Sequence, residues 1–243
     1  MLRHNSLSHD LFWLDGRCCA DYGLQLQGPV TFGSPEPRVE TISIPGRNGT
    51  LTFAEGAFSN VSGAARCFAL REDDAGRALI AIKRWCLLDA GYRRLAVSNE
   101  PDCYRLARVS AGPETEIRLR RLAPFSIQFD CQPQRFLLSG SRPIRLAISG
   151  AVLSNPGFPA KPLITVYGSG PGTLAVSGRM VQIKNLSSSL TLDCELQDAY
   201  KGLENHNADI SAPEFPVLEA GENRIGWTGG VTHIEIIPRW WTL

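Results

Sequence analysis

Most of the chain alternates apolar and polar residues in short runs separated by Gly, Pro and Asn, a pattern typical of half-buried β-strands joined by turns. The clearest case is residues 39–53, VETISIPGRNGTLTF, where the alternation stops at Pro45 and resumes at Leu51. Proline suits a strand end because it has no N–H for a ladder, and Asn48-Gly49 suits a tight turn with positive φ. The pattern therefore predicts a β-hairpin that holds Arg47, Asn48 and Gly49 at its tip.

The first half of the chain contains further segments with the two-residue period of strands. The predicted elements are an opening hairpin from residues 12–16 and 22–26, and strands at residues 58–61, 67–70, 91–95, 104–109, 116–122 and 127–131. In residues 116–122, apolar and basic residues alternate, which predicts one buried face and one face that presents Arg118 and Arg120. A solvated face is the simplest interpretation, and a contact with acidic residues of a neighbouring subunit is the alternative.

One stretch changes to a helical period. Leu79, Ile82 and Cys86 lie on one stripe, Asp73-Asp74 can cap its start, and Gly91 can end it. This is the only helix that the sequence predicts. Its basic residues could serve a partner or a membrane surface, but a lone amphipathic helix in a β protein more often covers a sheet and completes its core.

Residues 139–162 are rich in Gly, Ser and Pro and are predicted to contain a domain boundary. The charge also changes there, from a net +4 in residues 1–145 to −3 in residues 146–243. The second part contains short alternating runs that predict a β-sandwich, at residues 163–167, 173–176, 180–184, 190–193 and 234–237. We therefore expect a mainly β protein of two sandwich domains, residues 1–145 with one packed α-helix and residues 146–243, with the last strand free to return to the first domain.

Composition narrows the class of protein. An apolar fraction of 43% over 243 residues is that of a folded globular protein, and the net charge of +1 does not favour a protein that binds nucleic acid by neutralising phosphates. The sequence contains no apolar run of membrane-spanning length and no secretory leader at its start, so we expect a chain kept in a cytosol with no membrane insertion. The seven cysteines form no metal-binding pattern and are expected to be reduced thiols.

Three groups of residues resemble chemical sites, and each has a plainer interpretation. The Gly-rich segment 168–172 precedes a strand rather than the helix of a phosphate-binding loop, so a hairpin turn is predicted. Asp193, Glu195 and Asp198 could supply a glycosidase carboxylate pair, but acids at a strand end are usually a solvated turn. The four histidines are scattered. We assign no catalytic residue, metal site or cofactor and expect no enzyme activity.

Several short motifs occur in the order found in one family. Residues 44–49, I-P-G-R-N-G, follow an opening of the form F-x-L-D-G and D-Y-G-L at residues 12–16 and 21–24. Residues 125–133 fit F-x-x-x-F-x-C-x-P, and the chain ends P-R-W-W-x-L. In this order the motifs resemble those of the distal tail proteins of long, non-contractile-tailed bacteriophages, and the resemblance extends from Phe12 to Leu243.

The resemblance implies a structural virion protein, a hub that forms a hexameric ring at the tail tip and is made in the host bacterial cytoplasm. Its implied partners are further copies of itself, the tail tube protein, and tail tip or receptor-binding proteins that serve host adsorption, with no sequence-specific nucleic acid. It implies a galectin-like C-terminal domain. The assembly-interface candidates are Arg47, Asn48, Gly49, Arg118, Arg120, Trp240 and Trp241.

The closing pair Trp240-Trp241 is expected to be buried, either within the monomer or against another subunit, because exposed tryptophans favour aggregation.

A second function remains open. A carbohydrate-binding module would need only a C-terminal sandwich with Tyr200 and Trp227 on one face to stack against host-surface glycans.

Overall fold

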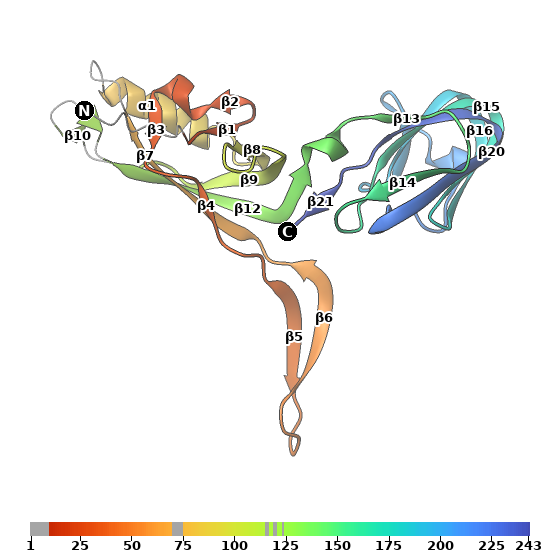
Figure 1. Cartoon of the computed structure of the whole chain (residues 1–243), viewed down its shortest axis with the longest axis horizontal. Coiled ribbons are helices and arrows are strands. Elements are labelled where there is room, and N and C mark those ends of the chain that lie inside the picture. Colours follow the sequence, from red (N-terminus) through yellow and green to blue (C-terminus); the bar gives the residue numbers. More distant parts are fainter. Residues whose placement is uncertain (1–9, 70–74, 115–116, 119–120, 123) are drawn as a thin grey trace, which may run out of the picture. The chain divides into compact units, whose positions relative to one another are not determined.

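A computed structural model describes residues 10–69, 75–114, 117–118, 121–122 and 124–243 of the chain. The chain forms two compact units, Met1–Arg135 together with Leu243, and Phe136–Thr242 (Figure 1). The fold is mainly β, as predicted, and the described residues contain one α-helix, α1. That each unit is a domain able to fold alone, with a division near residue 145, stays a prediction.

The first unit contains a large antiparallel sheet with the strand order β2-β1-β8-β9-β12-β7-β3, and β4 also pairs with β7. A short 3-10 helix, η1 (Cys19–Tyr22), links β2 to β3. The strands of this sheet are β1 (Phe12–Leu14), β2 (Arg17–Cys18), β3 (Leu24–Leu26), β4 (Thr31–Phe32), β7 (Val61–Ala69), β8 (Arg93–Val97), β9 (Cys103–Ala111) and β12 (Phe125–Leu137).

Helix α1 (Ala75–Leu87) covers the core of this unit, as its apolar stripe predicts. Ile82, Trp85 and Cys86 share one buried cluster with Phe12 of β1 and Phe129 of β12. The ring of Phe12 stacks on Trp85 at 5.6 Å and meets Phe129 edge-on at 5.6 Å. These aromatic contacts join the helix to strands from both ends of the unit.

Two other pairs of strands in the first unit stand apart from the large sheet. Strand β5 (Pro37–Ser43) pairs only with β6 (Thr50–Phe58), which confirms the predicted hairpin. In Figure 1 this hairpin forms a long two-stranded arm. Strand β10 (Ile117–Arg118) pairs with β11 (Arg121–Leu122), so the single strand predicted through residues 116–122 is wrong.

The second unit is a β-sandwich whose sheet has the order β13-β20-β15-β16-β17-β18, with β14 on β20 and β19 on β16. Its elements are η2 (Leu138–Ser141), β13 (Ile144–Leu146), β14 (Ala151–Asn155), β15 (Leu163–Val176), β16 (Arg179–Asp193), β17 (Asp198–Lys201), β18 (Glu204–Asn205), η3 (Asn207–Asp209), β19 (Ile210–Ser211), β20 (Gly221–Ile237) and β21 (Trp241–Thr242). Its core includes Ile164, Leu174, Ile183, Leu192 and Ile234, all buried.

The Gly-rich segment 168–172 is not the predicted hairpin turn but part of β15, where the register against β16 and β20 shifts. A Cβ atom on Gly168 would collide with the carbonyl oxygen of Gly230, and one on Gly172 would lie 2.9 Å from the carbonyl oxygen of Thr228. Glycine is therefore required here because two backbones approach closely at a bulge. Alternation alone cannot distinguish such a bulge from a turn.

Other predicted boundaries also need correction. Residues 58–61 are not a strand, because Phe58 ends β6 and Val61 begins β7. Helix α1 ends at Leu87 rather than at Gly91, and its predicted cap at Asp73-Asp74 lies outside the described residues. The guanidinium of Arg93 donates to the carbonyl oxygens of Trp85 (2.9 Å) and Cys86 (2.6 Å), and so satisfies carbonyls that the helix leaves free at this end.

All seven cysteines are free thiols, as predicted, and every one except Cys18 is buried. Burial raises the pKa of Cys67, Cys131 and Cys194 to about 12 because a thiolate loses its hydration there. In the described part of the chain no helix is long and apolar enough to span a membrane.

Candidate assembly surfaces

The hairpin of β5 and β6 presents two chemically different faces. Residues paired across an antiparallel ribbon lie on the same face, and so does every second pair along it. The pair Ile42 and Leu51 therefore shares a face with the pair Glu40 and Phe53. We call this set the apolar face; Ile42 is 43% exposed and Phe53 50% exposed. The opposite face carries Thr41 and Thr52, together with Val39 at 47% exposure, and we call it the hydroxyl face. An isolated two-stranded ribbon is marginally stable in water, so the apolar face is a candidate contact surface.

The loop between these strands holds the predicted tip residues, with a different turn from the one expected. The N–H of Arg47 donates to the carbonyl oxygen of Ile44 (3.1 Å), and Gly46 between them has φ +80°. Pro45-Gly46 thus forms the hydrogen-bonded turn, because proline fixes φ at its first central position and glycine allows positive φ at the second. Arg47 and Asn48 follow it, and both are exposed.

The structure gives less support to Arg118 and Arg120 as residues of an assembly interface. Arg118 lies in β10, where its backbone pairs with that of Arg121. Arg120 lies outside the described residues, so the predicted basic face of residues 116–122 stays a prediction.

The C-terminal tryptophans are half-buried against the second unit's own residues. The ring of Trp241 stacks on Phe158 at 4.8 Å, and its Nε1 donates to the carbonyl oxygen of Pro159 (3.0 Å). The carbonyl oxygen of Trp240 accepts from the N–H of Leu137 (2.8 Å). Contacts within the unit therefore cover part of the Trp241 side chain, and contact of either tryptophan with another subunit stays a prediction.

The residues proposed for glycan stacking lie in different environments. Tyr200 is half-buried, whereas Trp227 is only 8% exposed and belongs to the core of the second unit. A ring must offer an open face to stack on a sugar, so the burial of Trp227 counts against this pair. The solvated acidic turn predicted at residues 193–198 is also wrong for Asp193, because this residue is buried and paired with Arg239.

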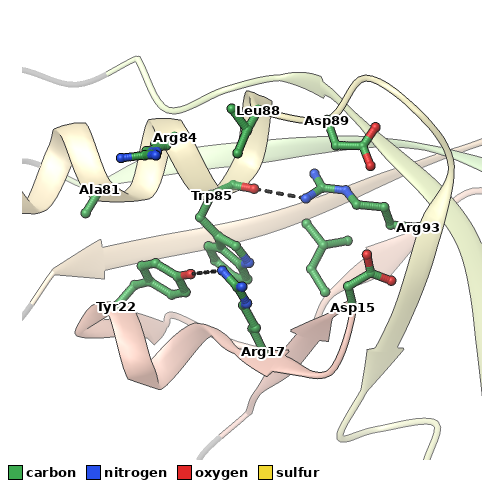
Figure 2. A pocket seen from close by; sticks show the side chains of 10 residues that line it. Asp15, Arg17, Tyr22, Ala81, Arg84, Trp85, Leu88, Asp89 and Arg93 are labelled. Carbon is green, nitrogen blue, oxygen red and sulfur yellow. Dashed lines mark hydrogen bonds between the residues drawn. The ribbon is translucent and has the colours of Figure 1, made fainter.

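A hollow of about 630 Å³ lies beside α1, and the sequence did not predict it (Figure 2). Tyr22 and Trp85 stack at 4.3 Å in its wall, and Arg17 reaches from β2 to donate to the Tyr22 hydroxyl (3.4 Å). Arg84 and Leu88 line it from the helix side; Asp15, Asp89 and Arg93 also line it. We call this hollow the α1 groove. The sequence feature that could have indicated this hollow is the composition of α1, whose described residues include three basic side chains and no acidic one.

Nothing in the described residues points to a metal centre, since no three or more His, Cys, Asp and Glu side chains are grouped to hold an ion.

Comparison with known proteins gives a match in structure but not in sequence. No protein-family profile matches the chain, and no curated protein sequence matches it. Among solved structures, the crystal structure of the Dit protein (gp 19.1) of phage SPP1 matches with a TM-score of 0.73 at 13% identity. The match covers 96% of this chain and 99% of that chain, and that protein is described as a paradigm of the hub adsorption apparatus in phages that infect Gram-positive bacteria. The chain therefore has the fold of a phage distal tail hub protein over nearly its whole length.

Proposed function

We propose that the protein is a structural component of a phage tail, a distal tail hub rather than an enzyme. The observation that carries this proposal is the end-to-end match in fold, because both units of the chain fall within the 96% that is covered. A match confined to one β-sandwich would carry much less weight, since such sandwiches host many unrelated functions. The order of the short sequence motifs supports the same assignment independently of the fold.

The hub is proposed to form a hexameric ring through its first unit. The number six comes from the family resemblance. The physical support is the hairpin of β5 and β6, whose apolar face is open in the single chain and would be covered by another copy. A head-to-tail ring also needs two different complementary surfaces on each subunit, and its closure protects strand edges from indiscriminate pairing.

Within the particle, we infer that the ring joins the tail tube to the tail tip or baseplate and carries receptor-binding or other adsorption proteins. DNA would have to pass through such a ring without stalling. Clusters of Lys and Arg on the lumen would bind phosphates, so we place Arg118 and Arg120 away from it. The proteins that the hub contacts are proposed from the family resemblance alone.

Electron microscopy of assembled tails tests the proposal directly. Antibody labelling of the protein on intact particles should mark the tail tip, and averaged images of the labelled region should show sixfold symmetry. Native mass spectrometry of the purified protein should show a six-subunit species at high concentration. Label on the capsid or its absence from particles would overturn the assignment to the tail. Threefold or open helical packing at the tail end would overturn the ring.

A further inference from the structure

The α1 groove combines features that a solvated surface does not require. The aromatic pair Tyr22 and Trp85 forms part of its wall, and Leu88 on its rim is 76% exposed. An exposed leucine beside an aromatic-lined hollow is typical of a surface that another chain covers.

The charges around the groove favour an anionic occupant. Arg17, Arg84 and Arg93 line it, against the two carboxylates of Asp15 and Asp89. One oxygen of Asp89 already accepts a hydrogen bond from the N–H of Gly91 (2.8 Å). Lys83 and Arg84 on the helix form no ion pair with any residue that the structure describes. Arg93 is already bound to the carbonyl oxygens at the end of α1, so Arg84 is the arginine of the groove that has no partner among the described residues.

We propose that the α1 groove binds an acidic segment of a partner protein, in which a carboxylate pairs with Arg17 or Arg84 and an adjacent large apolar side chain covers Leu88 and the aromatic wall. A polypeptide supplies both groups on neighbouring residues. A nucleic acid is a poorer fit, because its sugars and phosphates offer no large apolar group that could cover Leu88 and the aromatic wall. The groove lies within the first unit, so binding does not require the ring of the proposed function.

A designed peptide tests the proposal on the full chain. The probe is a fluorescein-labelled peptide of twelve residues in which Glu alternates with Leu and Phe, and its binding is followed by fluorescence anisotropy. The expected result is saturable binding that weakens as salt increases. The double variant Arg17→Glu and Arg84→Glu should weaken binding about tenfold or more, because each reversal replaces an attraction with a repulsion. A peptide with Lys in place of Glu should bind this variant more tightly than it binds the original protein.

The controls separate the groove from general charge and from fold. Arg224→Glu changes the charge of an exposed residue in the second unit and should alter the affinity by less than about twofold. Circular dichroism checks that the double variant is folded, and the milder Arg84→Gln should weaken binding in the same direction. Equal binding of a peptide with Gln in place of Glu, or an equal loss in Arg224→Glu, would overturn the proposal. So would a change in subunit number caused by the double variant in sedimentation experiments, since the groove would then be a contact between copies.

Discussion

The guanidinium of Arg239 donates two parallel hydrogen bonds to the carboxylate of Asp193, from Nη1 to Oδ1 at 2.7 Å and from Nη2 to Oδ2 at 2.9 Å. The two residues are 46 positions apart, and the pair attaches the C-terminal segment to the end of β16. Arg239 adopts a positive φ of 57°, which is uncommon for a residue with a side chain. Its two-pronged pairing satisfies a carboxylate whose side chain is only 7% exposed.

Arg239→Ala should destabilise the second unit by about 2–3 kcal/mol at pH 7, because it leaves the Asp193 carboxylate buried without its charged partner. The hydrogen bonds from Arg239 are the main reason that the pKa of Asp193 lies below its ordinary value of 3.8. A carboxylate with a lowered pKa stabilises the fold above that ordinary value, and this contribution is lost as the pH falls through the folded pKa. The difference between the two proteins in thermal unfolding should therefore shrink from pH 7 to pH 3. An unchanged difference would show that the ionised pair is not its source; Arg224→Ala is the control.

The thiols should react in two classes. At pH 8 a pKa of about 12, as for Cys67, leaves about one thiol in ten thousand ionised, and the thiolate is the reactive form. Maleimide labelling of the folded protein, read by mass spectrometry, should modify Cys18 first because it is the only cysteine that is not buried. The other six should react only as the chain unfolds. Fast labelling of Cys67 or Cys194 at low denaturant would contradict the buried core described above.

The apolar face of the hairpin should control assembly without controlling the fold. Ile42→Ser and Phe53→Ser each remove apolar area from a side chain that is about half exposed, and should weaken subunit association by about 1–2 kcal/mol. Thr41→Ser and Thr52→Ser on the hydroxyl face are the matched controls. Native mass spectrometry at a series of protein concentrations gives the association constants, and thermal melting should be nearly equal for all four variants. Equal effects from both faces would refute the assignment of the contact to the apolar face.

Arg47→Ala tests the predicted role of the hairpin loop. We expect weaker assembly, because an exposed guanidinium can form a two-pronged bond to a carboxylate or to backbone carbonyls of a neighbour. The melting temperature should change little, since Arg47 is exposed and its backbone N–H, which closes the turn, is kept in alanine. Arg224→Ala again serves as the control. Unchanged oligomer size together with unchanged phage infectivity would show that Arg47 is only a solvated loop residue.

Limited proteolysis tests the division into domains. The segment from Ala147 to Gly150 is exposed and lies between β13 and β14, in the Gly- and Pro-rich stretch that the sequence marks as a boundary. A protease of broad specificity should cut between residues 139 and 162 before it cuts the core strands of either unit. First cuts inside β15, β16 or β12, with this stretch left intact, would contradict two independently folded domains.

The sequence alone determined the features that depend on neighbours along the chain. Alternation with Pro45 and Gly49 located the hairpin of β5 and β6, and the stripe through Ile82 and Cys86 located α1, because period and turn chemistry are local properties. The apolar surroundings of the cysteines likewise indicated free buried thiols. The mainly β character of the chain follows from the same local signals.

Tertiary structure decided the features that depend on residues far apart. Gly168 resembles a turn residue in the sequence, yet it lies inside a strand because the backbone at Gly230 approaches it. From the sequence, Trp227 is a candidate for stacking on a sugar, but it is buried in the core. Asp193 is buried and paired with Arg239, which comes from the end of the chain. The α1 groove is lined by Asp15 in the turn after β1, by residues of α1 about seventy positions later, and by Arg93 beyond the helix. No local period records such a meeting, because only packing brings these side chains together.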